Sequence, residues 1–206
     1  MKTSRLAQTS GGLSLYFYEL TYTIDEETRI GVLIMEEKFV RESRTVKSSV
    51  VLPPDTNNHG TLFGGKLMAY IDDVAAISAI RHARKNVVTA STDSVDFLQP
   101  IKEGHSVCLE SFVTWTKTTS MEVFVKVISE NLLSGERKVC AVSFLTFVAL
   151  DEEGKPTPVP KVIPETEEEK WLHEHASERA VARKKRREES KKLAKEFGVK
   201  KPWDPM

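Results

Sequence analysis

The sequence predicts an α+β fold in which one curved antiparallel sheet wraps around a single long buried helix. Between about Gly65 and Arg84 the apolar residues recur at a helical period of roughly 3.6, whereas in four later segments they recur at a period of about 2. One more strand-like segment precedes the helix. A single sheet buries one face by curling round a central helix, so these observations favour that arrangement.

The expected elements follow one another with short connections. Residues 44–52 have strand composition, and residues 53–65 form a turn-rich loop of Pro, Asp, Asn and Gly. The helix at 65–84 is apolar nearly all round, so we expect the rest of the protein to surround it. Strands are predicted at residues 87–97, 105–117, 120–132 and 137–150.

The chain divides into an extension, a core domain and a tail. Residues 1–40 are either an added strand or a disordered arm, and translation could also begin at Met35. Residues 41–152 form the core domain. Residues 153–206 comprise a Pro-rich linker and a long charged helix at 165–197, whose acidic residues precede its basic ones in accord with the helix dipole.

The charge and composition of the sequence limit the classes of molecule that the protein is expected to bind. Thirty basic and thirty acidic residues give a net charge of zero, which offers no general attraction to nucleic acid or to an anionic membrane. The basic run at 183–187 is interleaved with glutamates and is expected on a solvated face, with RNA binding as the alternative. Cys108 and Cys140 lie in apolar runs and are expected as free thiols. No membrane or secretion signal is present, so we expect a cytoplasmic protein.

The common catalytic signatures do not occur. The sequence has no G-x-S-x-G elbow, no phosphate-binding or dinucleotide-binding glycine motif, and no C-x-x-C or H-E-x-x-H spacing. Its five histidines are scattered. We therefore expect neither a metal nor a cofactor.

A carboxylate pair, Asp72 and Asp73, lies in the middle of the predicted buried helix. Burying a carboxylate costs several kcal/mol, so such a group serves a structural network or a reaction. Just upstream lie Asn57 and the pair Gly64 and Gly65, which either permit a tight turn or present helix N-terminal amides to an oxyanion. Together, these residues offer a carboxylate as base or nucleophile and helix N-terminal amides for an oxyanion, which are the groups that acyl transfer requires when no catalytic serine is present.

The motif N-x-x-G-x-x-x-G-G, followed seven residues later by Asp, runs from Asn57 to Asp72. With the segments VVTASTDSVDFLQPIKEGHSV and TKTTSMEVFVKV, it resembles the hotdog-fold acyl-CoA thioesterases, in their cytosolic acyl-CoA hydrolase branch. The resemblance covers about residues 44–185. It implies a homo-oligomer whose active unit is a dimer, assembled as a trimer of dimers, with Asn57 and Asp72 contributed by opposite subunits.

The resemblance implies hydrolysis of a fatty acyl-CoA. The amide of Gly65 would polarise the thioester carbonyl, Asn57 would orient water or the carbonyl, and Asp72 would act as general base. Direct attack by Asp72 to form a mixed anhydride is the competing mechanism. Asp73 serves as the control, because adjacent helical side chains point about 100° apart.

Contacts to the CoA portion are expected at two further places. Gly64 and the strand beginning at Thr92 would flank the pantetheine, and the turn containing Lys117, Thr118 and Ser120 would contact the nucleotide. The same turn could equally be an ordinary polar hairpin.

Two alternatives remain open at this stage. One is a hotdog-fold acyl-CoA-binding or regulatory protein without hydrolytic activity. The other is hydration or dehydration of an acyl thioester, for which His59 would have to act as the acid-base residue. The presence of both Asn57 and Asp72 favours the hydrolase.

Overall fold

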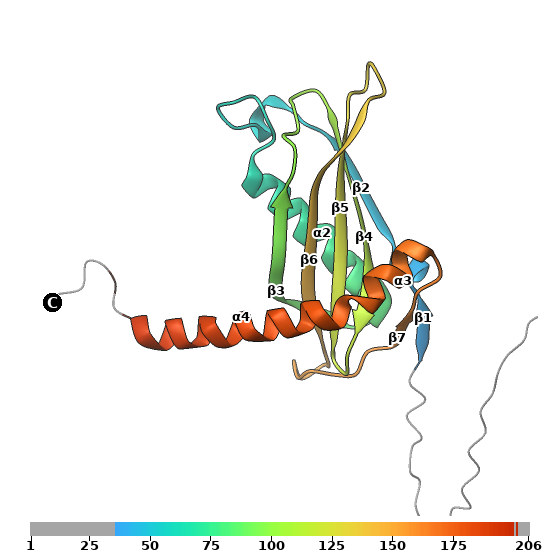
Figure 1. The fold of residues 1–206 in the computed structure, drawn as a ribbon, viewed down its shortest axis with the longest axis vertical. Coiled ribbons are helices and arrows are strands. Elements are labelled where there is room, and N and C mark those ends of the chain that lie inside the picture. The colour runs from blue at the N-terminus through green and yellow to red at the C-terminus, as the bar shows by residue number, and fades with distance from the viewer. Residues whose placement is uncertain (1–35, 200, 202–206) are drawn as a thin grey trace, which may run out of the picture. The chain divides into compact units, whose positions relative to one another are not determined.

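The computed structural model describes residues 36–199 and residue 201. Five antiparallel strands form one sheet in the order β2-β4-β5-β6-β3. The helix α2 (Gly64–Ala83) runs along one face of this sheet, and α4 (Ala176–Phe197) crosses the other (Figure 1). The strands of the sheet are β2 (Thr45–Val50), β3 (Asn86–Phe97), β4 (Ser106–Thr116), β5 (Ser120–Glu130) and β6 (Arg137–Leu150).

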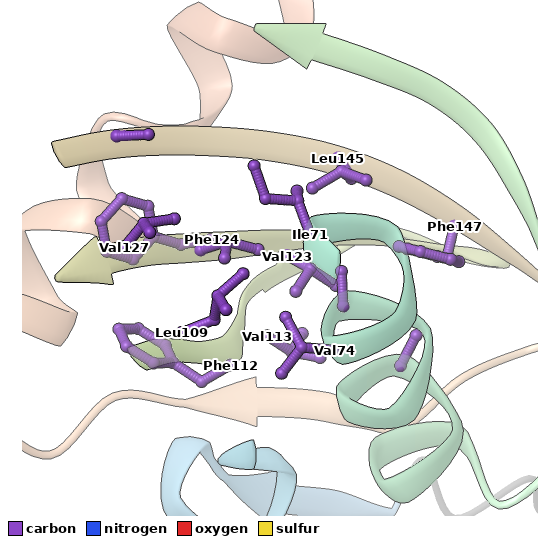
Figure 2. Packing of buried hydrophobic residues seen from close by; sticks show 14 of the residues in the cluster. Ile71, Val74, Leu109, Phe112, Val113, Val123, Phe124, Val127, Leu145 and Phe147 are labelled. Atoms are coloured by element: carbon purple, nitrogen blue, oxygen red, sulfur yellow. The ribbon is translucent and has the colours of Figure 1, made fainter. Parts of the chain in front are cut away.

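The core lies between α2 and the sheet. Ile71 and Val74 point from α2 toward Val113 and Val123 of the strands (Figure 2). Along β5 every second residue from Met121 to Val127 is fully buried, as the period-2 pattern predicted. Each buried aliphatic side chain stabilises the fold by about 1.5–3 kcal/mol relative to exposure, so this layer fixes the position of α2.

The predicted sheet around a central helix is confirmed, with one difference. The five strands of the sheet pack against one side of α2 and leave the opposite side uncovered. Met68, Ile77 and Ile80 are therefore about half exposed in the single chain. Asp72 and Asp73 are also exposed, so the expectation that the single chain buries these carboxylates is wrong.

The long strands agree with the predicted ranges to within about two residues at each end. β3 is an edge strand and is interrupted by two β-bulges, at Ala90 and Asp93, which have no register partner on β6. A bulge re-aims the side chains next to it, so β3 does not present its residues in simple alternation.

A second, two-stranded sheet joins the start of the described chain to the Pro-rich linker that precedes α3. β1 (Glu37–Phe39) pairs in parallel with β7 (Lys161–Ile163), and α1 (Val40–Ser43) follows it. The buried Val40 belongs to the main core. The expected N-terminal extension lies outside the described residues up to residue 35. A strand, one of the two alternatives expected for residues 1–40, is present at residues 37–39, whereas the short helix α1 was not predicted.

The charged tail is two helices rather than the predicted one. α3 (Glu167–Glu174) begins at Thr166, which forms a capping box with Glu169, and the chain then breaks at His175 before α4. The imidazole of His175 stacks on Trp171 at 4.4 Å and bonds the Trp171 carbonyl oxygen. No helix in residues 36–199 is long and apolar enough to cross a membrane.

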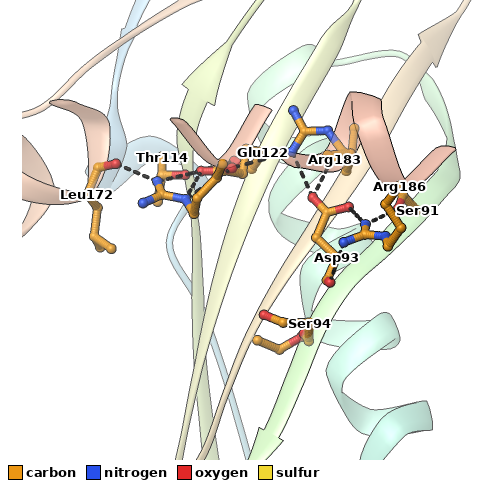
Figure 3. A network of polar contacts seen from close by, with 11 residues as sticks. Ser91, Asp93, Ser94, Thr114, Glu122, Leu172, Arg183 and Arg186 are labelled. Atoms are coloured by element: carbon orange, nitrogen blue, oxygen red, sulfur yellow. Dashed lines mark hydrogen bonds and ion pairs between the residues drawn. The ribbon is translucent and has the colours of Figure 1, made fainter. Parts of the chain in front are cut away.

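Three arginines attach α3 and α4 to the sheet. Glu122 of β5, which is only 1% exposed, accepts hydrogen bonds from Arg179 and Arg183. Asp93, at the second bulge of β3, accepts from Arg183 and Arg186 at 2.7 and 2.6 Å (Figure 3). The basic run at 183–187 is therefore solvated only in part. Two of its arginines, Arg183 and Arg186, form ion pairs with carboxylates of the sheet.

Candidate active site

The loop before α2 is shaped by the side chain of Asn57. Its Oδ1 accepts from the backbone N–H groups of His59 at 2.9 Å and Thr61 at 3.3 Å, while Nδ2 donates to Thr61 Oγ1 at 3.0 Å. Gly60 occupies the left-handed region with φ of 68°, which glycine adopts without steric cost. Asn57 is thus held in a fixed orientation at the rim of the loop.

The two glycines begin α2 and have different surroundings. The first amides of a helix have no acceptor within the helix, so the N–H groups of Gly64 and Gly65 are available to a ligand. A Cβ on Gly65 would lie 2.5 Å from Cε1 of Phe63, whereas a Cβ on Gly64 would make an ordinary contact with Phe97. A side chain at position 65 would therefore have to displace the exposed Phe63 ring, whereas position 64 has room for a Cβ.

A hollow of about 380 Å³ lies between this loop and the end of β3. Asn57 and Gly64 line it on one side, and Leu67, Phe97 and Ile101 supply apolar walls. Its size is within the range of small-ligand sites. Asp72 does not line it, so one chain does not bring the predicted asparagine and aspartate into the same hollow.

The two carboxylates of α2 point to opposite edges of the sheet. Oδ1 of Asp72 accepts a hydrogen bond from Oγ1 of Thr89 on β3 at 3.0 Å. Oδ2 of Asp73 forms an ion pair with Lys47 of β2 at 2.9 Å. Asp73 therefore has an ion-pair partner within the chain, while Asp72 has one hydrogen-bond donor and no ion-pair partner among the described residues.

Thr92 is exposed on the edge strand β3, between the two bulges. Lys117, Thr118 and Ser120 lie at the turn between β4 and β5, where the N–H of Lys117 donates to the Ser120 carbonyl at 2.9 Å. The carbonyl of Thr118 accepts from Val159, which belongs to the Pro-rich linker. In the described structure, no hydrogen bond or ion pair joins these four residues to Asp72 or Asn57.

Thr89 was not predicted as a site residue. Its segment offers several hydroxyls at 89, 91, 92 and 94, and alternation alone does not single one out. The bulge at Ala90 follows Thr89 directly and determines which hydroxyl reaches α2.

Comparisons of the sequence and of the structure with known proteins point to the same family. Residues 59–135 match the model of the Thioesterase superfamily. The chain is 64% identical over 168 residues to YkhA of Bacillus subtilis, named an uncharacterized acyl-CoA thioester hydrolase, with coverage of 82% of this chain and 98% of YkhA.

Two solved structures extend the comparison. An acyl-CoA hydrolase from Staphylococcus aureus, described in complex with butyryl-CoA, CoA and CoA disulfide, is 48% identical with a TM-score of 0.75, covering 78% of this chain and 98% of that one. An apo-hexameric acyl-CoA thioesterase is 57% identical with a TM-score of 0.72, covering 73% and 97%. The chain therefore belongs to the Thioesterase superfamily of hotdog-fold enzymes, among the acyl-CoA thioester hydrolases.

Proposed function

We propose that this enzyme hydrolyses the thioester bond of fatty acyl-CoA to a fatty acid and CoA, at a site formed by Asp72 and Asn57 of opposite subunits. The observation that carries the proposal is the carboxylate of Asp72, exposed on α2 and oriented by Thr89. A carboxylate with no ion-pair partner in the described chain is free to accept a proton from water. We place the reaction in the cytoplasm, in keeping with the free thiols of Cys108 and Cys140.

The spacing of three residues supports the assignment. Alanine variants of the Staphylococcus aureus hydrolase replace an asparagine, an aspartate and a threonine at positions 28, 43 and 60 of that enzyme. Those positions are separated by 15 and 17 residues. Asn57, Asp72 and Thr89 have the same residue types and the same two intervals.

A dimer supplies what the single chain lacks. The hollow beside Asn57 contains no carboxylate of Asp72, and the side of α2 that carries Asp72 also exposes Met68, Ile77 and Ile80. A second copy would cover this apolar side and bring its own loop to Asp72. The hexameric relative is consistent with three such dimers in one assembly.

In the proposed reaction, the amide of Gly65 donates to the thioester carbonyl oxygen and stabilises the negative charge that develops there. Asn57 orients the attacking water, and Asp72 accepts its proton before the CoA thiolate leaves. If Asp72 instead attacks directly, a mixed anhydride forms. A single turnover in ¹⁸O-water tests for direct attack: label in Asp72 requires an anhydride that water hydrolyses at the Asp72 carbonyl, whereas attack of water on the acyl carbonyl, in either route, puts the label in the fatty acid.

The test is release of free thiol from a panel of acyl-CoAs. We expect turnover by the wild type and by Asp73→Asn, and a loss of at least about a hundredfold in Asp72→Ala and Asn57→Ala, with assembly unchanged. An inactive wild type would instead favour an acyl-CoA-binding or regulatory protein. Full activity in Asp72→Ala would refute the site.

A further inference from the structure

The register of the edge strand β3 is not fixed by burial of its own side chains. None of residues 86–97 is buried in the single chain, and Val87 and Val95, which pack against the core, lie at either end of this stretch. The residues between them are mostly Thr and Ser. A strand without a buried face has a weakly specified register, so the side chains of β3 alone leave open which hydroxyl faces α2.

The bulge at Ala90 decides which face of the sheet the first two hydroxyls occupy. Opposed residues of an antiparallel pair lie on the same face. Thr89 is opposite Phe147 of β6, which belongs to the core beneath α2. Ser91 is opposite Thr146 and accepts a hydrogen bond from α4, on the other face. Residues 89 and 91 would share a face in a regular strand, so the bulge turns Thr89 toward α2 and Ser91 toward α4.

One guanidinium of α4 closes on the segment between the two bulges. Nη1 of Arg186 donates to the backbone carbonyl of Asp93 at 2.8 Å. Nη2 donates to Oδ1 of Asp93 at 2.6 Å and to Oγ of Ser91 at 3.0 Å (Figure 3). A slip of β3 by one residue would turn both side chains to the α2 face and break these contacts. Arg186 therefore holds the bulged register from the opposite side of the sheet.

The carboxylate that Arg186 bonds is itself held on two sides. Oδ2 of Asp93 accepts from Arg183 of α4 at 2.7 Å and from Oγ1 of Thr146 of β6 at 3.0 Å. The Asp93 side chain is only 10% exposed. Hydrogen bonds to an ionised group are stronger than those between neutral groups, so this contact is suited to holding a strand in place.

We propose that Arg186 is a positioning residue for thioester hydrolysis, acting through β3. Its fork of donors holds the register that directs the hydroxyl of Thr89 to the carboxylate of Asp72. The inference rests on the proposed function, because it connects a residue on the far face of the sheet to the reaction at Asp72. The helix α4 is then needed for the rate of the reaction as well as for the stability of the fold.

Steady-state release of thiol from acyl-CoA by the full-length oligomer tests the assignment. The variant is Arg186→Gln, and the matched control is Arg179→Gln, which removes an arginine that joins the same helix to Glu122 of β5. We expect kcat to fall about fivefold in Arg186→Gln with KM nearly unchanged, and to change less than about twofold in the control. A loss caused only by a loosened helix would appear in both variants.

A double-mutant cycle with Thr89→Val shows whether Arg186 acts through Thr89. If it does, the double variant Arg186→Gln with Thr89→Val should be within about twofold of Thr89→Val alone. Independent losses of about fivefold and about tenfold would instead multiply to about fiftyfold.

Amide hydrogen exchange over residues 87–95, measured by mass spectrometry, tests the structural part without reference to activity. Exchange should be faster in Arg186→Gln than in the wild type and unchanged in Arg179→Gln.

The proposal is overturned if Arg186→Gln keeps the wild-type kcat, if the control loses as much, if the losses in the double variant multiply, or if exchange over residues 87–95 is unchanged. A wild type that releases no thiol from any acyl-CoA would refute the proposed function. Faster exchange in Arg186→Gln alone would in that case still support the role of Arg186 in holding β3.

Discussion

The hydroxyl of Thr89 donates a 3.0 Å hydrogen bond to Oδ1 of Asp72, and this bond joins the edge strand of the sheet to the middle of α2. It leaves the second carboxylate oxygen without a partner in the described chain. In the proposed site Thr89 would be a positioning residue, because its hydrogen bond holds the rotamer of the carboxylate and so the oxygen that would face the substrate.

Replacing Thr89 with Val removes the hydroxyl at nearly constant shape. We expect kcat for thiol release to fall about tenfold with KM nearly unchanged, because the carboxylate loses its fixed orientation. Thr89→Ser restores the hydroxyl and should recover most of the rate. A Val variant as active as the wild type would show that the hydrogen bond is only structural.

Co-expression of two inactive variants tests whether the site is shared between subunits. A mixed dimer of Asn57→Ala and Asp72→Asn has one site with both residues intact if they come from opposite subunits. Random assembly should then restore about a quarter of the wild-type activity per protomer. If both residues come from the same subunit, every site is damaged and no activity returns.

Arg183→Met should destabilise the fold. The substitution leaves Asp93 with Arg186 and Glu122 with Arg179, so the loss is smaller than for a fully broken buried pair, and we expect about 2 kcal/mol in the free energy of unfolding. Urea denaturation measures it. The control Lys185→Met, on the exposed side of α4, should change stability by less than about 0.5 kcal/mol.

The fold should lose stability in mild acid through His82. Burial lowers the pKa of His82 below its ordinary value of 6.5, and the ring donates to the Pro160 carbonyl through Nε2 while Nδ1 has no hydrogen-bond partner among residues 36–199. The unfolded chain therefore takes up a proton before the folded one does. The free energy of unfolding should fall below about pH 6.5, by at most about 1.4 kcal/mol per pH unit.

Urea titrations at pH 7.5, 6.5 and 5.5 measure this slope. His82→Leu removes the titrating ring and should flatten the decline, whatever the variant's own stability at neutral pH. An unchanged slope would assign the decline to other groups.

Much of the fold could be predicted from the sequence because the periods are locally encoded. Met121 to Val127 alternate as a strand with one buried face, and the helix before them has its own period. β1 could not be predicted in this way, since its three residues pair with β7 more than a hundred positions away. The break at His175 lies in a segment rich in helix-forming residues, so composition alone does not reveal it.

The candidate site could be predicted only in part. Asn57 and Asp72 stand out through the glycines between them, whereas Thr89 depends on a bulge that no local pattern reveals. Arg183 and Arg186 lie in a segment whose composition is typical of a solvated helix. Asp93 and Glu122 lie at positions where polar side chains of a strand usually face solvent. Their pairing follows from where α4 crosses the sheet.

That crossing determines where the chain can be shortened. A protein cut at the Pro-rich linker would keep Asn57, Asp72 and Thr89, and would leave Asp93 and Glu122 on a sheet without the arginines that neutralise them. Asp93 is four positions from Thr89 on the same edge strand, so the damage would begin beside the carboxylate of Asp72 that we propose to be catalytic. Truncations and C-terminal fusions should therefore be placed in the last turns of α4, well after Arg186, whose guanidinium bonds Ser91 and Asp93 of β3.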